Sequence, residues 1–250
     1  MSSLTKEELL FMAKVCEEVQ KFKEMLFYIK QAILQTPGNE PTIEERNLLI
    51  VAFQNIVGEK RASWRAASGL EQKELLKGHP NANLIIQLRK TVEAELKEIC
   101  YDCSTFVETS ILPTCNTAQS RVFFNKMRGD YYRYLAEFLT GNEKGEVTEK
   151  GLAAYEEATG IAEAELSVTD PIRLGLVLNF SVFYYEILNN VPRSQEIAKK
   201  AFDDAIVKID ELNEEDYKDT TMIMQLLRDG LTLWATDFEE EKPEQAEQSN

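Results

Sequence analysis

One arginine of this acidic chain stands between aromatic residues, an unusual place for a cation. In the stretch KMRGDYYRYLAE, residues 126–137, Arg133 lies between Tyr132 and Tyr134, although the formal net charge of the chain is −15. Burying a guanidinium among aromatic side chains costs free energy unless an anion neutralises it. A planar guanidinium that apolar neighbours hold rigidly suits bidentate binding of a carboxylate or a phosphate. The pattern therefore favours an anionic ligand at Arg133.

Two expected helix faces carry further polar side chains at helical spacing. Gln54 and Arg61 are seven residues apart, nearly two turns, so they share one face. Lys126, Asp130 and Arg133 follow one another at spacings of four and three and share another face. For Lys126 with Asp130, ordinary ion pairing on a helix surface is the simpler interpretation. Arg133, with its aromatic neighbours, is the stronger candidate for ligand binding.

Two apolar stripes are expected opposite these cations. Leu178 and Val182 are one helical turn apart, and Asn179 and Glu186 lie on the adjoining stripe, seven residues apart. The last helix carries a second apolar stripe, made of Ile223, Leu226, Leu233 and Trp234. Core packing is the simpler interpretation of such stripes when periodicity is the only evidence.

Residue patterns typical of enzymes are absent from the sequence. It contains no glycine-rich phosphate loop and none of the short histidine or serine motifs of hydrolases. The only histidine, His79, lies in a GHPN turn, where a solvated role is expected. Cys100 and Cys103 form one C-x-x-C, which with Cys16 and Cys115 would supply four zinc ligands. Because that pair lies in a helical stretch with no second pair to face it, buried thiols are favoured, and we expect no metal, cofactor or catalysis.

Composition narrows the fold class and the partners. Only 11 glycines and 7 prolines occur among 250 residues, while helix-forming residues abound, so the expected class is all-α. The 43 acidic residues outnumber the 28 basic ones, and such a surface repels a nucleic-acid backbone and an anionic membrane. No apolar run reaches the roughly 18 residues of a membrane span, and no secretory leader opens the sequence. We expect a protein of the cytoplasm, also present in the nucleus, that binds neither nucleic acid nor membrane.

Apolar periodicity and turn residues predict about nine antiparallel helices. The first two lie in residues 5–34, and the third opens after Thr42, which with Glu45 matches a capping box. The other six are expected at 82–112, 117–140, 147–165, 171–190, 194–211 and 215–236. We interpret residues 1–236 as a single domain. Residues 237–250 carry five glutamates and almost no apolar residue, which predicts a disordered acidic tail.

A weak internal repeat supports stacked helical hairpins and leaves a second architecture open. AYEEA at 154–158 returns as AFDDA at 201–205, a period of 47 residues. A helical-repeat scaffold of the tetratricopeptide type, which binds unmodified peptide tails, would explain this repeat. It would not explain the combination of Arg61, Arg133, Tyr134 and Asn179. If peptide binding depends on a phosphate group, the protein is an anion-binding protein that uses Arg133. If it does not, the scaffold interpretation is favoured.

Four long stretches of the sequence carry a more specific pattern. They are RNLLIVAFQNIVGEKRASWRAASGLEQK at 46–73, VFFNKMRGDYYRYLAE at 122–137, PIRLGLVLNFSVFYYEIL at 171–188 and YKDTTMIMQLLRDGLTLW at 217–234. These stretches resemble the 14-3-3 family, and the resemblance spans residues 5–236. It implies nine antiparallel helices that form a concave amphipathic groove, in a cup-shaped homodimer that can also pair with other isoforms. It further implies a non-catalytic adaptor that binds phosphoserine- or phosphothreonine-containing client segments and clamps, masks or bridges them.

The resemblance identifies the expected anion as a phosphate. It maps the phosphate-holding arginines of the family onto Arg61 and Arg133 and its phosphate-contacting tyrosine onto Tyr134. A phosphate with about −1.5 to −2 charges would balance two guanidiniums. By the same resemblance, Asn179 hydrogen-bonds the ligand backbone. The remaining groove positions are Gln54, Lys126, Leu178, Val182, Glu186, Ile223, Leu226, Gly230 and Trp234.

Two positions depart from the family pattern. Gln54 stands where the family usually has a third cation, a lysine, and Gly230 stands where it has an asparagine that clamps the ligand backbone. Lys60 is six residues from Gln54 and points about 120° away, so it does not replace the missing lysine. Losing the hydrogen bond that an asparagine at position 230 would make weakens binding by about 0.5 to 1.5 kcal/mol. We therefore expect weaker phosphopeptide binding or an altered preference, not its loss.

Dimer formation is also implied by the resemblance. In the family, the first helix of one protomer packs on the third and fourth helices of the other. The matching positions are Val15 and Val19 for apolar contacts, Lys21 and Glu24 for charge pairs, Leu88 in place of an interface tyrosine, and Ser63, whose phosphorylation loosens dimers in the family. A plain helix serine is the simpler interpretation of Ser63.

Overall fold

The computed structural model describes residues 4–240, with side chains up to residue 236. Within that range the fold is all-α: it has nine α-helices and no strand. The α-helices are α1 (Lys6–Glu18), α2 (Phe22–Leu34), α3 (Ile43–Leu76), α4 (Ala82–Phe106), α5 (Ala118–Ala136), α6 (Gly141–Glu165), α7 (Pro171–Glu186), α8 (Val191–Ile206) and α9 (Glu214–Glu240). None of them combines the length and hydropathy of a membrane span in the part of the chain described.

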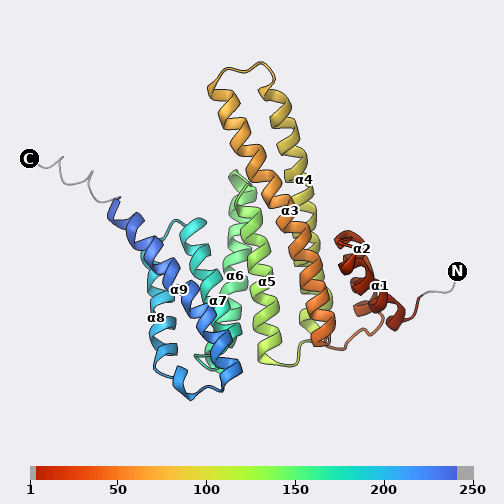
Figure 1. The fold of residues 1–250 in the computed structure, drawn as a ribbon, viewed down its shortest axis with the longest axis vertical. Helices are drawn as coiled ribbons and strands as arrows, with labels where there is room; N and C mark the ends of the chain where they lie inside the picture. Colours follow the sequence, from red (N-terminus) through yellow and green to blue (C-terminus); the bar gives the residue numbers. More distant parts are fainter. Residues whose placement is uncertain (1–3, 241–250) are drawn as a thin grey trace, which may run out of the picture. The chain divides into compact units, whose positions relative to one another are not determined.

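The chain divides into two compact units, the first ending at Cys115 and the second beginning at Asn116. In the first unit, α1 pairs with α2 and the long helices α3 and α4 form a hairpin, with α2 packed on α3 (Figure 1). A π-helical turn (Val107–Ile111) and a 3₁₀ turn (Leu112–Thr114) follow α4 and end this unit. The interpretation of residues 1–236 as a single domain stays a prediction.

The start of α3 confirms the capping box expected from the sequence. The backbone N–H of Glu45 donates to Thr42 Oγ1 at 3.2 Å, and the N–H of Thr42 donates to Glu45 Oε2 at 2.8 Å. Glu45 is 2% exposed, and Lys6 neutralises its carboxylate at 2.6 Å. Two backbone donors at the N-terminal end of the helix are therefore satisfied, which fixes where α3 begins.

The cysteines are free thiols, and three of them, Cys16, Cys100 and Cys103, are buried. Burial raises the pKa of the Cys16 thiol, and Glu24 raises it further. Among the described residues, no group of three or more His, Cys, Asp or Glu side chains is arranged to hold a metal ion. The pattern agrees with thiols that pack as small apolar groups.

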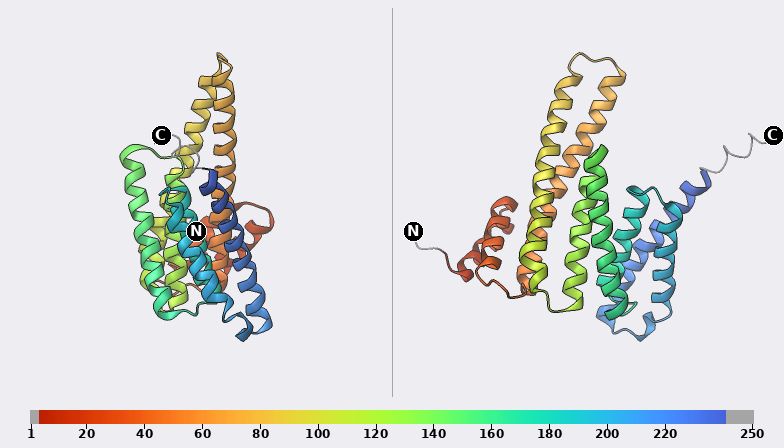
Figure 2. Two further views of the ribbon diagram at one scale, coloured as in Figure 1. Left: turned by 90° about the vertical axis from the view of Figure 1, so that its left-hand side faces the viewer. Right: turned by 180° about the vertical axis from the view of Figure 1, so that it is seen from behind.

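The second unit positions most of the expected site. α5 packs along α6 and on α7, while α7 also packs on α8 and α9 (Figure 2). The core between α7, α8 and α9 consists of Leu174, Ala198, Ala205, Ile209, Met224, Leu227 and Trp234. Because α7 contacts every other helix of this unit, its side chains link the faces of α5 and α9.

Several helix ends differ from the sequence prediction: α4 ends at Phe106 and not at residue 112, and α8 spans Val191–Ile206 and not 194–211. α6 begins at Gly141 and not at residue 147, with Thr140 as its N-cap. The first turns of α6 are polar, so apolar periodicity gives no sign of them. α9 continues to Glu240, so residues 237–240 of the expected tail are helical. The remaining tail, residues 241–250, lies outside the described residues.

Candidate functional site

Most of the side chains singled out in the sequence lie on α5, α7 and α9 of the second unit. α5 carries Lys126, Arg133 and Tyr134; α7 carries Leu178, Asn179, Val182 and Glu186; α9 carries Ile223, Leu226, Gly230 and Trp234. α7 packs against both α5 and α9. The three helices therefore place a charged group on α5 next to polar and apolar residues on α7.

A buried carboxylate, Asp130, organises the charged group. Its Oδ2 pairs with Lys126 Nζ at 2.8 Å. Its Oδ1 accepts hydrogen bonds from the Tyr155 hydroxyl at 2.6 Å and from Asn179 Nδ2 at 2.8 Å. Arg133 Nη2 is 3.9 Å from the same oxygen. The side chain of Asp130 thus joins α5, α6 and α7. It also links two of the residues expected to contact a ligand, Arg133 and Asn179.

The protonation of this group follows from burial and charge. Burial alone would raise the pKa of Asp130, but the positive charges of Lys126 and Arg133 outweigh it, and the pKa of Asp130 is lowered. Burial raises the pKa of the Tyr155 hydroxyl well above its usual value, and the negative charge of Asp130 adds to this effect. At neutral pH the carboxylate is ionised and Tyr155 is a hydrogen-bond donor.

Arg133 is buried but incompletely paired. It is 7% exposed, and its guanidinium lies 4.8 Å from the centre of the Tyr134 ring. Burial would lower its pKa, but the oxygens of Tyr155 and Asp130 outweigh burial and raise it, so Arg133 stays charged. Besides Asp130, its Nη1 approaches Glu186 at 3.5 Å and Glu137 at 3.7 Å.

These three ion pairs of Arg133 are longer than the roughly 2.7–3.2 Å of a good N–H···O hydrogen bond. Its buried Nε has no hydrogen-bond partner in the described part of the chain. A guanidinium offers five N–H donors, and a buried donor without an acceptor costs free energy. Arg133 is therefore rigid, charged and able to accept a further anionic partner.

Asn179 retains an acceptor for a ligand. Its Nδ2 is used on Asp130, and its Oδ1 makes no hydrogen bond among the described residues. The interaction with Asp130 fixes the orientation of the amide, since only the nitrogen end can donate to a carboxylate. The free carbonyl oxygen can accept a hydrogen bond from the backbone N–H of a bound peptide.

The apolar residues of α7 and α9 are partly open, with one exception. Leu178, Val182 and Ile223 are half-buried against the core, and Leu226 is 48% exposed. Trp234 differs, because it is only 2% exposed and its ring centre lies 5.7 Å from that of Tyr185. Most of the indole faces the core, and a ligand contact by Trp234 stays a prediction.

Gly230 explains how Trp234 reaches that position. A Cβ atom at residue 230 would lie 3.2 Å from Cη2 of the Trp234 ring and 3.3 Å from Cζ2. This separation is tight, so a side chain at 230 would have to push the indole by a few tenths of an ångström. The ring of Trp234 occupies space that glycine leaves empty.

The remaining groove positions of the sequence prediction lie in the first unit, on α3. Gln54 is exposed and Arg61 is half-buried. Lys60 is paired with Glu95 of α4 at 2.6 Å, and this hydrogen bond raises the pKa of Lys60. Lys60 is therefore committed within its own unit, in line with the expectation that it does not replace a lysine at 54. The placement of Arg61 beside Arg133 stays a prediction.

The positions expected at a dimer contact are accessible. Val15 is 36% exposed, Val19 59% and Leu88 59%. Lys21, Glu24 and Ser63 are exposed as well. The Ser63 hydroxyl donates to the carbonyl of Glu59 at 3.0 Å, as serines in helices commonly do. Their exposure leaves these positions available for the dimer contact that the resemblance implies.

Sequence reasoning missed Tyr155 as part of the site. The available indication was Gly129, which precedes Asp130: a Cβ atom there would lie 2.8 Å from the Tyr155 ring. Glycine in the middle of α5 lets the buried ring of α6 approach closely enough for its hydroxyl to reach Asp130. A glycine inside a helical stretch, next to a charged residue, marks such an approach, but it does not reveal which aromatic residue arrives.

Comparison with known proteins identifies the family. The 14-3-3 protein model matches residues 12–235. The chain is 52% identical over 241 residues to 14-3-3-like protein B of Vicia faba and 50% identical over 241 residues to 14-3-3 protein 9 of Solanum lycopersicum, each alignment covering 96% of this chain and 92% of the relative. It is 47% identical over 249 residues to 14-3-3-like protein GF14 phi of Arabidopsis thaliana, covering 99% of this chain and 93% of that protein.

The chain belongs to the 14-3-3 family. As a 14-3-3 protein it is a phosphopeptide-binding adaptor without catalytic activity, and the all-α fold with nine helices in the described range is the 14-3-3 fold. The family relationship implies phosphorylated clients and dimer formation. The interpretation of Arg133 as a residue that binds phosphate stays a prediction.

Proposed function

We propose that Arg61, Arg133 and Tyr134 hold the phosphate of a phosphoserine- or phosphothreonine-containing client segment. The observation that carries the proposal is the state of Arg133, which is buried and charged yet has only long ion pairs and an Nε without an acceptor. Phosphate oxygens offer the acceptors that this guanidinium lacks, and the Tyr134 hydroxyl adds a donor. Because Arg61 belongs to the first unit, residues 1–236 act as one domain in this proposal.

The neighbouring residues of α7 and α9 hold the rest of the segment. The Oδ1 of Asn179 accepts a backbone N–H next to the phosphorylated residue. Lys126 adds positive charge near Arg133 and, through Asp130, keeps the group in place. Leu178, Val182, Ile223 and Leu226 provide an apolar wall for the side chains that follow, and Glu186, Gly230 and Trp234 lie further along.

Two residues weaken the single site in this proposal. Gln54 gives no charge where a third cation would strengthen phosphate binding, and Gly230 gives no side-chain amide. Phosphate binding then depends mainly on Arg61 and Arg133. The affinity for one phosphopeptide is lower than that of a site with all three cations, and the preference around the phosphate differs.

A homodimer compensates for the weak single site. We assign Val15, Val19 and Leu88 to apolar contacts and Lys21 and Glu24 to charge pairs across the dimer, and the exposure of these residues supports the assignment. Phosphorylation of Ser63 would weaken the dimer. Two paired grooves let two phosphorylated sites of one client bind together, which raises the apparent affinity without any new contact. Clamping, masking and bridging of clients follow from this arrangement. We place this activity in the cytoplasm and the nucleus.

The test is a fluorescence anisotropy titration of one peptide in its phosphoserine and unphosphorylated forms. We expect the wild type to bind only the phosphorylated form and Arg133→Ala to lose that binding. Arg128→Ala is the matched control, because Arg128 lies on the same helix and interacts with Asn125 and Glu157 instead. Equal binding of the two peptide forms would contradict the proposal and favour a scaffold for unmodified tails.

A further inference from the structure

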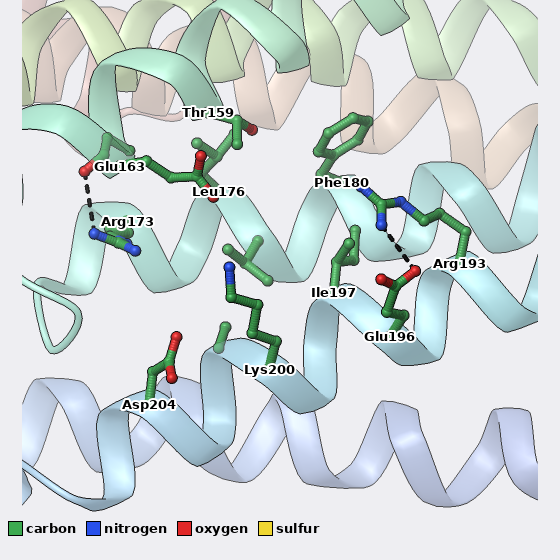
Figure 3. A pocket seen from close by; sticks show the side chains of 13 residues that line it. Thr159, Glu163, Arg173, Leu176, Phe180, Arg193, Glu196, Ile197, Lys200 and Asp204 are labelled. Atoms are coloured by element: carbon green, nitrogen blue, oxygen red, sulfur yellow. Dashed lines mark hydrogen bonds and ion pairs between the residues drawn. The ribbon is translucent and has the colours of Figure 1, made fainter.

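A pocket of about 180 Å³ lies in the second unit, between α6, α7 and α8, away from the residues assigned to phosphate (Figure 3). Its apolar surface is formed by Leu176, Val177, Phe180, Ile197 and Ala201. An apolar cavity of about 150 Å³ is known to accept benzene. This pocket therefore has room for one aromatic or branched side chain with a short polar extension.

The charged residues at one end of the pocket are paired with each other. Arg193 pairs with Glu196 at 2.8 Å, and its guanidinium lies 5.9 Å from the centre of the Tyr184 ring. Both charges at this end therefore have a partner in the protein. A ligand gains little there, because it would first have to separate the pair.

The other end carries charges that are not paired. Arg173 is half-buried, and its Nη1 donates to the backbone oxygens of Leu166 at 2.9 Å and Ala162 at 3.3 Å. These carbonyls end α6, so they hold the guanidinium in place without neutralising it. In the part of the chain that the structure describes, no carboxylate lies within ion-pair distance of Arg173. Its remaining donors are open to the pocket.

Three further charged groups reach the same space. Glu163 comes from α6, and Lys200 and Asp204 come from α8; all three line the pocket together with Arg173 and Phe180 (Figure 3). None of these three forms an ion pair within residues 4–236. Two cations and two carboxylates therefore surround an apolar surface, and each lacks a partner of opposite charge.

We propose that this pocket binds a small zwitterion with an apolar side chain, the chemical class of free aromatic and branched amino acids. The ligand carboxylate lies against Arg173 and Lys200, its ammonium group against Glu163 or Asp204, and its side chain against Leu176. A ligand with only one charge would satisfy one pair of groups and bring its charge close to the like-charged pair. Charge complementarity thus selects a molecule that carries both signs.

The experiment is an NMR titration of the full chain with L-phenylalanine, phenethylamine and 3-phenylpropanoate. The second compound lacks the carboxylate and the third lacks the ammonium group, while all three have the same ring. We expect L-phenylalanine to bind about tenfold more tightly than either analogue, the effect of one lost ionic contact. Equal shifts with all three would mean a purely apolar pocket, and no saturable shift would mean no site; either result overturns the proposal.

Variants locate the binding. Lys200→Met should weaken L-phenylalanine binding by about fivefold or more, because it keeps the stem but removes the charge. Lys199→Met is the matched control, since its neighbour Lys199 is paired with Asp203 on the surface. Ala201→Phe fills the pocket and should abolish binding, with circular dichroism reporting that the helices persist. Equal effects at residues 199 and 200 would refute the site.

The proposal is independent of the phosphopeptide site. The three variants should bind a phosphoserine peptide as the wild type does, because none of them changes α5 or the face of α7 that carries Asn179. Loss of phosphopeptide binding in Arg133→Ala with retained L-phenylalanine binding would separate the two sites in the opposite direction.

Discussion

Two arginines of this protein, Arg89 on α4 and Arg133 on α5, have opposite kinds of surroundings. Arg89 is bound at short distance by Glu71 and by Glu93, and Glu93 also accepts from the Trp64 indole at 3.0 Å. The hydrogen bond with Glu71 is the main cause of a raised pKa at Arg89. Arg133 is more deeply buried, but it has only ion pairs of 3.5 Å or longer.

The difference separates a cation with close partners in the protein from one that can take a ligand, as the proposed function requires. The interactions of Arg89 stay within one helical hairpin, so it stabilises α3 against α4. Arg133 is desolvated by burial, yet its ion pairs are long and its Nε has no hydrogen-bond partner in the described residues, which a stable fold tolerates where a ligand supplies an acceptor. Incomplete pairing of a buried charge, more than its sign, marks the candidate site.

The largest effect is expected when the anchor of Arg133 is removed. Asp130→Asn leaves Lys126 and Arg133 without their common carboxylate, and we expect a loss of about 3 kcal/mol in the free energy of unfolding. Urea denaturation at pH 7 measures it. A loss below about 1 kcal/mol would show that Asp130 does not hold the group together.

The pH dependence of that loss tests its electrostatic origin. Because the folded pKa of Asp130 is lowered, its contribution is present above the unfolded pKa, near the ordinary value of 3.8, and is lost as the pH falls through the folded pKa. The difference in stability between wild type and Asp130→Asn should therefore be constant near pH 7 and shrink below pH 3.8. A difference that does not change with pH would point to packing.

The comparison itself is tested by the same substitution at both arginines. Arg89→Met should lower the free energy of unfolding by about 1–2 kcal/mol and leave phosphopeptide affinity unchanged. Arg133→Met should reduce that affinity strongly and change stability less, since the ion pairs of Arg133 are long and its Nε has no hydrogen-bond partner in the described residues. Urea denaturation and anisotropy titration of each variant measure both quantities. If the two variants lost stability and phosphopeptide affinity to the same extent, the distinction between Arg89 and Arg133 would be wrong.

The smallest effects are expected at the two departures from the family pattern. Gln54→Lys should tighten phosphopeptide binding by about threefold to tenfold at low salt, and the gain should fall as salt screens the charge. Gly230→Asn should give a smaller gain in affinity, because the Cβ of the new asparagine must first displace the Trp234 ring. Titrations at two salt concentrations, with tryptophan fluorescence to follow Trp234, measure both. A double variant with no gain in affinity would show that these positions do not limit binding.

The helices could be predicted from the sequence where a cap or an apolar face marks them. α3 follows from Thr42 and Glu45, and the start of α7 from Asp170 and Pro171. The first turns of α6 could not, because Gly141 to Glu146 carry no apolar periodicity and are mostly exposed. Helix propensity decides such a polar segment only weakly.

The sequence singles out the residues of the candidate site but not the geometry that joins them. Arg133 stands out from its aromatic neighbours, and family resemblance adds Asn179, which the structure ties to the same anchor. The role of Asp130 as that anchor was hidden, since its spacing from Lys126 equally describes an ordinary surface pair. Its contact with Tyr155 joins residues 25 apart on different helices, and no local pattern encodes such a distance.

The shared oxygen of Asp130 makes Tyr155 a built-in reporter. Oδ1 accepts from Asn179 and from the Tyr155 hydroxyl at once, so any pull on Asn179 changes how strongly that oxygen holds the phenol. Peptide occupancy at α7 would thus be readable from a tyrosine that no peptide touches, through its hydroxyl exchange or the resonance of a labelled ring. Under the proposed function, a client that binds Asn179 would therefore be linked to α6 through this one oxygen.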